Sequence, residues 1–307
     1  MTAARIDTHT SSIGEWLLYA GALLVGAVLY VLCRFYPADL PIWLPWEFSW
    51  PVYLTTVLVL GWFALGLKRL SRAQHPPLWR STCFVVGVLS LYAMVQTHID
   101  YYAQHMFFVH RAQHFILHHV AAFLIALGAP GSVLWAGMPD FLKPLFASRP
   151  VRAFVDFMMH SVIAPVLFVT TIYVWLIPQI HTRVMLDANL YEFMNWTMAV
   201  DGIFFWCLIL DPRPKPPARL GSGLRAILII AVEPPQMVIG AVLSLSMTNY
   251  YPVYEICGRF MNIPAIGDQH YGGLIIWLPG TLLSLLAIII VLINMRLNEE
   301  SAEHAKA

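Results

Sequence analysis

Long apolar runs that are almost free of charge constrain this chain more than any other feature of its sequence. The eight runs are residues 15–34, 50–68, 82–99, 104–127, 153–178, 189–210, 224–247 and 270–295. A helix of about 20 apolar residues crosses the hydrocarbon core of a bilayer. Only 11% of the residues are charged, less than half the share usual in soluble domains. The sequence therefore predicts an all-α polytopic transmembrane bundle with about eight spans, or seven as the alternative.

Basic residues are unequally distributed between the loops, and this predicts the orientation of the chain. Alternate loops carry Lys68, Arg69, Arg72 and Arg80, then Lys143, Arg149 and Arg152, and then Arg213, Lys215, Arg219 and Arg225, whereas the opposite loops carry only Arg183 and Arg259. Because basic loops stay in the cytoplasm, we expect a cytoplasmic segment at 1–14, one transmembrane domain at 15–295 and a cytoplasmic tail at 296–307. The first run is longer than the apolar core of a signal peptide, so we expect it to be retained as a span.

One predicted span is unusually rich in histidine. Six histidines fall within 22 residues, at His98, His105, His110, His114, His118 and His119. Residues four apart share a helix face, so His110, His114 and His118 form one stripe, with Met106 one turn earlier. Imidazole suits copper, zinc, iron and nickel, and an added thioether favours Cu(I). The stripe predicts a metal or proton site that opens outward; the alternative is that the histidines hydrogen-bond between helices.

Further polar residues occur in the predicted outer connections and inside the spans. His181 and Glu192 flank one outer connection, and Asp268 and His270 precede the last run as candidate ligands at the mouth of the membrane. The alternative for Asp268 is helix N-capping. Arg111 is predicted either to pair with a carboxylate of a neighbouring span or to reach water at the outer interface. The carboxylates within reach of such a pairing are Glu192, Asp201 and Glu233.

Asp201 and Glu233 also suggest a polar path that leads inward from the outer site. The two prolines after Glu233 predict a break in the run 224–247, and broken helices at membrane depth usually line a cavity or pack against protein. The alternative is a kinked helix with a neutralised Glu233.

Four pieces of the sequence carry a resemblance to a known family. They are Phe48–Pro51, His110–His114 with Leu127–Pro130, Trp175–Pro178 followed by Tyr191-Glu192 and Phe205-Trp206, and Asp268–Gly280. Beyond about residue 45 the chain is similar to the caa-type cytochrome c oxidase assembly factor CtaG family of bacterial membrane proteins. The last piece, which resembles the family's Asp-Gln-x-x-Gly-Gly signature, is the most specific of the four.

The resemblance implies a role in the maturation of haem–copper oxidase at the bacterial inner membrane. It implies that the protein binds copper, as Cu(I), at the outer face and helps to deliver or insert it, with oxidase subunits and a periplasmic copper chaperone as partners. Arg111 stands where the family has Met, and Leu176 and Phe193 stand where the family has His. Either the additional histidines replace those ligands, or the chain is a divergent branch with another client.

Two other functions remain open on the sequence alone. A bis-His haem redox protein would pair His110 or His114 with His160 or His181, and a metal or proton transporter would use the path through Asp201 and Glu233. No nucleophile–base arrangement, phosphate loop or hydride-cofactor fingerprint is visible, so we do not expect an enzyme. The net charge of +1 gives no indication of a nucleic-acid partner.

Overall fold

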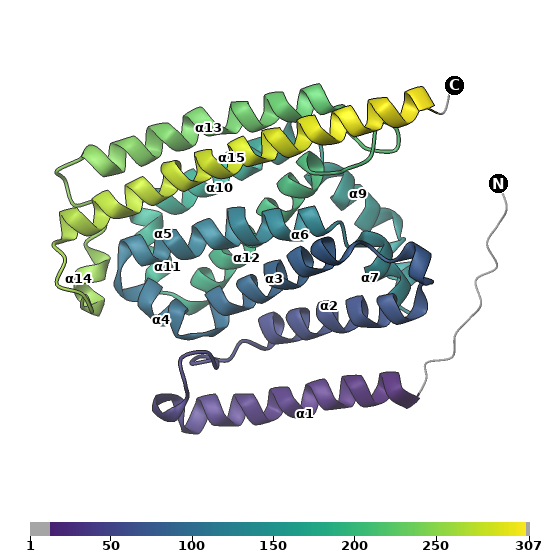
Figure 1. Cartoon of the computed structure of the whole chain (residues 1–307). Helices are drawn as coiled ribbons and strands as arrows, with labels where there is room; N and C mark the ends of the chain where they lie inside the picture. The colour runs from purple at the N-terminus through teal and green to yellow at the C-terminus, as the bar shows by residue number, and fades with distance from the viewer. Residues whose placement is uncertain (1–12, 305–307) are drawn as a thin grey trace.

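The computed structural model describes residues 13–304 and shows a bundle of helices (Figure 1). Apart from a single bridge between Pro45 and Thr97, none of these residues forms β-structure. The predicted all-α bundle is therefore confirmed. The terminal residues 1–12 and 305–307, on which parts of the predicted cytoplasmic segments fall, lie outside the described residues.

Five helices are long and apolar enough to cross a membrane. They are α1 (Ile13–Phe35), α2 (Trp50–Arg69), α3 (Leu78–Gln96), α13 (Ser222–Leu245) and α15 (Ala265–His304). Two bent pairs raise the number to as many as seven. In the first pair, one continuous helical stretch meets α7 (Gly131–Gly137) at 74°. This stretch consists of α5 (Phe107–Phe115), η3 (Ile116–Ala121) and α6 (Ala122–Gly128). In the second pair, α9 (Arg149–Met158) meets α10 (Ile163–Leu176) at 71°.

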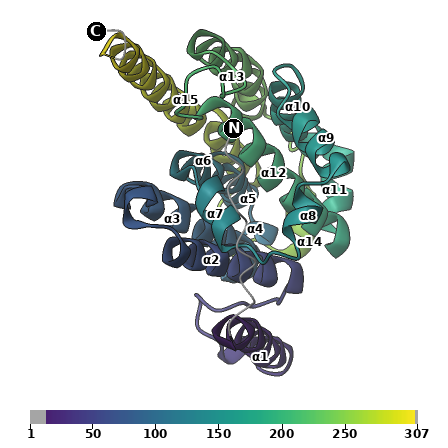
Figure 2. The same cartoon turned by 90° about the vertical axis from the view of Figure 1, so that its right-hand side faces the viewer.

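The predicted run 189–210 corresponds to α12 (Ala188–Ile209), which the count by length and composition leaves out. This helix has 22 residues, but it carries Glu192, Asn195 and Asp201. It packs against η3, α6 and α10 (Figure 2). A helix inside a bundle is shielded from lipid by its neighbours, so it can carry polar side chains that a lipid-facing helix could not. Its polar composition and its length together agree with an interior position.

Helix α13 continues through Pro234 and Pro235, so the predicted break in this helix is wrong. The two prolines lack N–H donors, yet close packing against α15 holds the helix together along its length (Figure 1). A Cβ atom added at Gly240 would lie 3.0 Å from the Gly273 carbonyl oxygen, which shows how near the two backbones are. The Tyr173 hydroxyl also donates to the Pro235 carbonyl at 2.7 Å. Tertiary packing thus overrides the local helix-breaking tendency.

The elements predicted to lie on the outer side gather at one end of the bundle, at the left in Figure 1. They are α4 (His98–His105), α11 (Pro178–Met185), α14 (Val253–Cys257) and the starts of α5 and α15. Helix α1 begins and α15 ends at the opposite end. The remaining short elements are η1 (Pro37–Asp39), η2 (Arg72–Gln74) and α8 (Lys143–Phe146). Which end faces the cytoplasm stays a prediction.

Candidate functional site

The histidine stripe lies on the central helix of the bundle, and the start of that helix is fixed by a residue from α15. The Asp268 carboxylate accepts the backbone N–H groups of Phe107 at 2.9 Å and Phe108 at 2.8 Å, and it pairs with Arg259. A carboxylate on the free N–H groups of a first helical turn is a stabilising cap. Asp268 therefore caps α5 and orients His110 and His114, one and two turns further along.

A chain of hydrogen bonds connects three histidines through one tyrosine. His181 Nδ1 donates to the Trp175 carbonyl at 2.9 Å, so its Nε2 must accept from the Tyr254 hydroxyl at 3.0 Å. The same hydroxyl oxygen then accepts from His110 Nδ1 at 2.7 Å. His110 Nε2 is left as an acceptor for His114 Nε2 at 3.0 Å. The Trp175 carbonyl thus sets the tautomers of His181, His110 and His114, because each bond in this row fixes the next.

His110 and His114 are the two predicted metal ligands that the structure brings together. Both are buried, and their Nε2 atoms face each other at 3.0 Å. A metal ion between them would take the lone pair of His110 Nε2, while His114 would move its proton to its own Nδ1, which has no partner. Among the side chains that the structure describes, which leave out that of Cys257, no group of three or more His, Cys, Asp or Glu is placed to hold a metal ion. The structure thus brings two of the predicted nitrogen ligands together, and metal binding by them stays a prediction.

The site also contains Asn195, Tyr254 and Met185, which no sequence pattern singled out. The single N–H of His114 Nε2 is shared between His110 Nε2 and Asn195 Oδ1, which lies 3.1 Å away, and the Met185 sulfur lies 3.9 Å from the Tyr254 hydroxyl. Burial, followed by the positive charge of Arg111, lowers the pKa of His181 to about 3, so this ring is neutral at physiological pH. The site therefore offers uncharged imidazoles in a dry environment.

A second polar network borders the histidine pair and centres on Asp100 of α4. This buried carboxylate accepts from Gln113 at 2.6 Å, Tyr191 at 3.0 Å and Gln104 at 3.0 Å. Burial raises the pKa of Asp100 to about 6, although the three hydrogen bonds act in the opposite direction. The Tyr191 ring lies 5.6 Å from the His110 ring, between centroids, so the two networks are neighbours.

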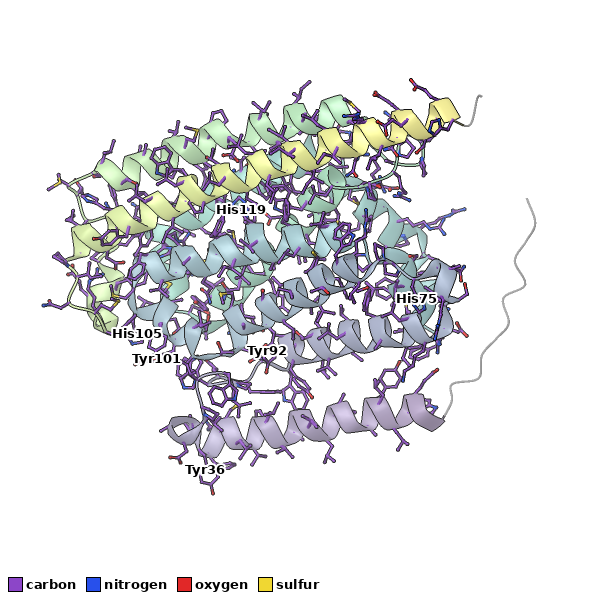
Figure 3. All side chains as sticks on the ribbon, in the orientation of Figure 1. Tyr36, His75, Tyr92, Tyr101, His105 and His119 are labelled. Atoms are coloured by element: carbon purple, nitrogen blue, oxygen red, sulfur yellow. The ribbon has the colours of Figure 1, made fainter. Side chains whose placement is uncertain are left out.

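The π-helical turn η3 places His118 and His119 at mid-depth in the bundle, and Figure 3 labels His119 there. His118 Nε2 lies 3.2 Å from Asp201 Oδ1, but neither Asp201 oxygen has a partner with hydrogen-bond alignment. A Cβ atom at Gly202 would overlap the His118 carbonyl, so α12 approaches this turn closely. Single π-helical turns are frequent at functional sites.

Arg111 is buried, with 3% of its surface exposed. Both alternatives predicted for it, a carboxylate partner and access to water, are wrong. It does not reach water, and the candidate carboxylates bond elsewhere. Glu192 accepts from Ser49, Asp201 lies against His118, and Glu233 accepts from Thr281 and Ser284.

The Arg111 Cζ atom lies 5.3 Å from the centre of the Phe107 ring. Together with His114, His118 and His119, Arg111 lines a crevice with room for about 20 Å³.

The other predicted ligands make separate contacts. His105 Nδ1 donates to the Tyr101 carbonyl at 2.8 Å, and both residues lie at the α4 end of the bundle (Figure 3). His270 Nε2 donates to the Ser246 carbonyl at 2.8 Å. Met106 is buried directly before α5, and His98 Nδ1 is buried without a partner. The structure therefore does not join these four residues to the His110–His114 pair.

The Tyr254→Phe variant tests the bridge between His110 and His181. Removing the hydroxyl leaves a buried donor on His110 and a buried acceptor on His181, so the free energy of unfolding should fall by about 2 kcal/mol. Detergent-solubilised protein unfolded by denaturant gives the measurement. The Tyr271→Phe variant is the control because Tyr271 is exposed, and it should change nothing. Equal effects of the two variants would rule out the bridge.

Comparison with known families gives one match. The family described as cytochrome c oxidase caa3 assembly factor (Caa3_CtaG) matches residues 61–297, which include the histidine stripe, Arg111 and Asp268.

Three curated relatives, all described as uncharacterised, come from mycobacteria. The proteins of Mycobacterium bovis and Mycobacterium tuberculosis are each 28% identical over 319 residues, covering 96% of this chain and 44% of the relative. A Mycobacterium leprae protein is 29% identical over 266 residues, covering 80% of this chain and 38% of the relative. The chain thus spans less than half the length of the curated relatives it matches. No solved structure matches it.

Proposed function

The chain belongs to the family of cytochrome c oxidase caa3 assembly factors, and we propose that it assists haem–copper cytochrome c oxidase assembly by binding Cu(I). The observation that carries this proposal is the buried His110–His114 pair, whose Nε2 atoms face each other at 3.0 Å. In this role the protein acts as a membrane carrier that hands copper on and does not work as an enzyme.

The chemistry of the pair favours Cu(I) over divalent ions. Soft, monovalent Cu(I) is well served by imidazole and thioether ligands, and the Met185 thioether lies within 3.9 Å of the tyrosine that orients His110. A divalent ion would bring twice the charge to two histidines that bond to no carboxylate, and burying uncompensated charge is strongly unfavourable. Two neutral nitrogens in a dry site therefore select for the lower charge.

The same geometry disfavours the haem alternative. The Tyr254 hydroxyl bridges His110 and His181, and the two ring centroids are 5.3 Å apart, so a porphyrin does not fit between them. His160 is exposed at the bend between α9 and α10. The transporter alternative loses its broken helix, because α13 is continuous. Copper handling is the function that these contacts support best.

We further propose that copper is delivered along the row of hydrogen-bonded side chains that begins at His114. From His114 the hydrogen bonds run through His110 and Tyr254 to His181, at the end of the bundle that holds α4, α11 and α14. In our proposal this end faces the periplasm, both termini are cytoplasmic, and the protein resides in the bacterial inner membrane. Oxidase subunits would receive the copper, and a periplasmic copper chaperone would supply it.

Copper binding by the purified full chain tests this proposal. Under anaerobic reducing conditions, titration against a colorimetric Cu(I) chelator should show about one Cu(I) per chain, because the site offers one facing pair of nitrogens. The His110→Ala plus His114→Ala variant should lose this binding. The matched control is His75→Ala plus His160→Ala, which removes two exposed imidazoles far from the pair and should keep it.

The same variants give a cellular readout through the copper content and activity of the client oxidase. The site variant should lower both, and the control should leave both unchanged. If the His110/His114 variant binds copper and matures oxidase as well as the unaltered protein, the assignment fails.

A further inference from the structure

The guanidinium of Arg111 lies inside the bundle without a counter-charge from the described part of the chain. The residue is 3% exposed, and its buried Nε and Nη2 atoms have no hydrogen-bond partner. The side chain lines the crevice between α5, η3, α10, α12 and α15. Three N–H donors, one on Nε and two on Nη2, and a full positive charge therefore lie at this crevice without a partner.

Four of the five carboxylates of the surrounding helices are hydrogen-bonded or ion-paired with other groups, and Arg111 forms no ion pair with the fifth, Asp201. The bonded pairs are Asp100 with Gln113 and Tyr191, Glu192 with Ser49, Glu233 with Thr281 and Ser284, and Asp268 with Arg259; Asp201 lies against His118. Arginine stays protonated in proteins, so the charge cannot be removed by loss of a proton. The Phe107 ring, at 5.3 Å, supplies only the partial compensation of a cation–π contact.

We propose that the crevice beside Arg111 binds one small monovalent anion, of the size and charge of chloride. An isolated charge in a low-dielectric interior is strongly unfavourable unless it is paired. The space of about 20 Å³ is enough for a water-sized species. A water molecule would satisfy the donors but would leave the charge uncompensated, whereas an anion satisfies both.

The surroundings of the crevice strengthen such an ion pair. Apolar side chains close it, among them Ile172, Met198 and Ile276. Attraction between opposite charges grows as the local dielectric falls, so an anion here would be held mainly by Arg111. The crevice shares His114 with the facing histidine pair, but the proposal does not depend on copper binding. An anion would also offset the repulsion between Arg111 and any cation on that pair.

Chloride-dependent stability of the metal-free, purified full chain tests the proposal. Chloride replaces gluconate at constant ionic strength, because gluconate is too large for the crevice. A ligand that binds only the folded state raises the unfolding midpoint, and we expect a rise of about 3 °C between 1 and 100 mM chloride. Equilibrium dialysis with radiolabelled chloride should show about one bound ion per chain, since the crevice admits one water-sized species.

Two variants separate this site from general salt effects. Arg111→Met removes the charge and keeps an unbranched apolar side chain, so it should lose the chloride response and the bound label. It should also unfold no more easily than the unaltered protein at low chloride, because it removes an uncompensated charge. Arg183→Gln, at an exposed position, should retain the full response. Equal responses of the unaltered protein and Arg111→Met, or no bound chloride in either, would overturn the proposal in favour of a water molecule.

Discussion

Replacing Asp268 by alanine is expected to lower the free energy of unfolding by about 3–5 kcal/mol. This residue is fully buried, pairs with Arg259 and accepts two backbone N–H groups at the start of α5. Removing the carboxylate leaves the partly buried charge of Arg259 and two backbone N–H groups at the start of α5 without their partner, and each of these losses is unfavourable. Unfolding of the purified protein in mixed micelles, followed by tryptophan fluorescence, gives the measurement.

The matched control for this prediction is Asp187→Ala at the start of α12. The Asp187 carboxylate accepts the N–H groups of Asn189 at 3.0 Å and Leu190 at 3.1 Å, but it is exposed and has no arginine partner. Loss of an exposed cap should lower the free energy of unfolding by about 1 kcal/mol. A similar loss in both variants would show that the buried ion pair with Arg259 contributes nothing.

Gly273→Ala has the second largest expected effect, a loss of about 3 kcal/mol in the free energy of unfolding. A Cβ atom at this position would lie 2.5 Å from Ser244 Oγ, 2.6 Å from the Ser244 nitrogen and 2.8 Å from the Gly240 carbonyl oxygen. Two of these three atoms belong to the backbone of α13 and cannot turn away. Helices α13 and α15 would have to move apart, which weakens the contact that keeps α13 continuous through its prolines.

Gly267→Ala, on the same helix, is the control. A Cβ atom at Gly267 would make only an ordinary contact, at 3.4 Å from Ile263. Alanine is favoured over glycine in a helix by up to about 1 kcal/mol, so this variant should be neutral or slightly more stable. If both glycine variants change stability in the same direction and by the same amount, close packing at Gly273 is not the reason for glycine there.

These two predictions give a physical meaning to the Asp-Gln-x-x-Gly-Gly pattern. Asp268 caps α5, and Gln269 donates to the Thr248 carbonyl at 3.0 Å and accepts from the Tyr250 N–H at 2.9 Å. Gly272 leaves room for the Phe107 ring, and Gly273 admits the α13 backbone. The most specific motif in the sequence therefore builds the support of the histidine pair and does not itself supply ligands to it.

The sequence alone determined the features that depend on local spacing and composition. Long apolar runs require helices in a membrane, because backbone polar groups must bond within the segment. The four-residue spacing of His110, His114 and His118 places them on one helix face in any fold. The membrane bundle and the facing pair His110–His114 could both be predicted for these reasons.

Only the tertiary structure decided which side chains from distant segments meet. Tyr254 lies 144 residues after His110 and Asp268 lies 161 after Phe107, and no local periodicity relates such positions. The same holds for Arg111, whose charge could be paired or unpaired depending on where three distant carboxylates bond. Pro234 and Pro235 would break an isolated helix, but packing against α15 keeps α13 intact. Local chemistry thus fixed which residues could form a site, and packing over long sequence separations fixed which of them do.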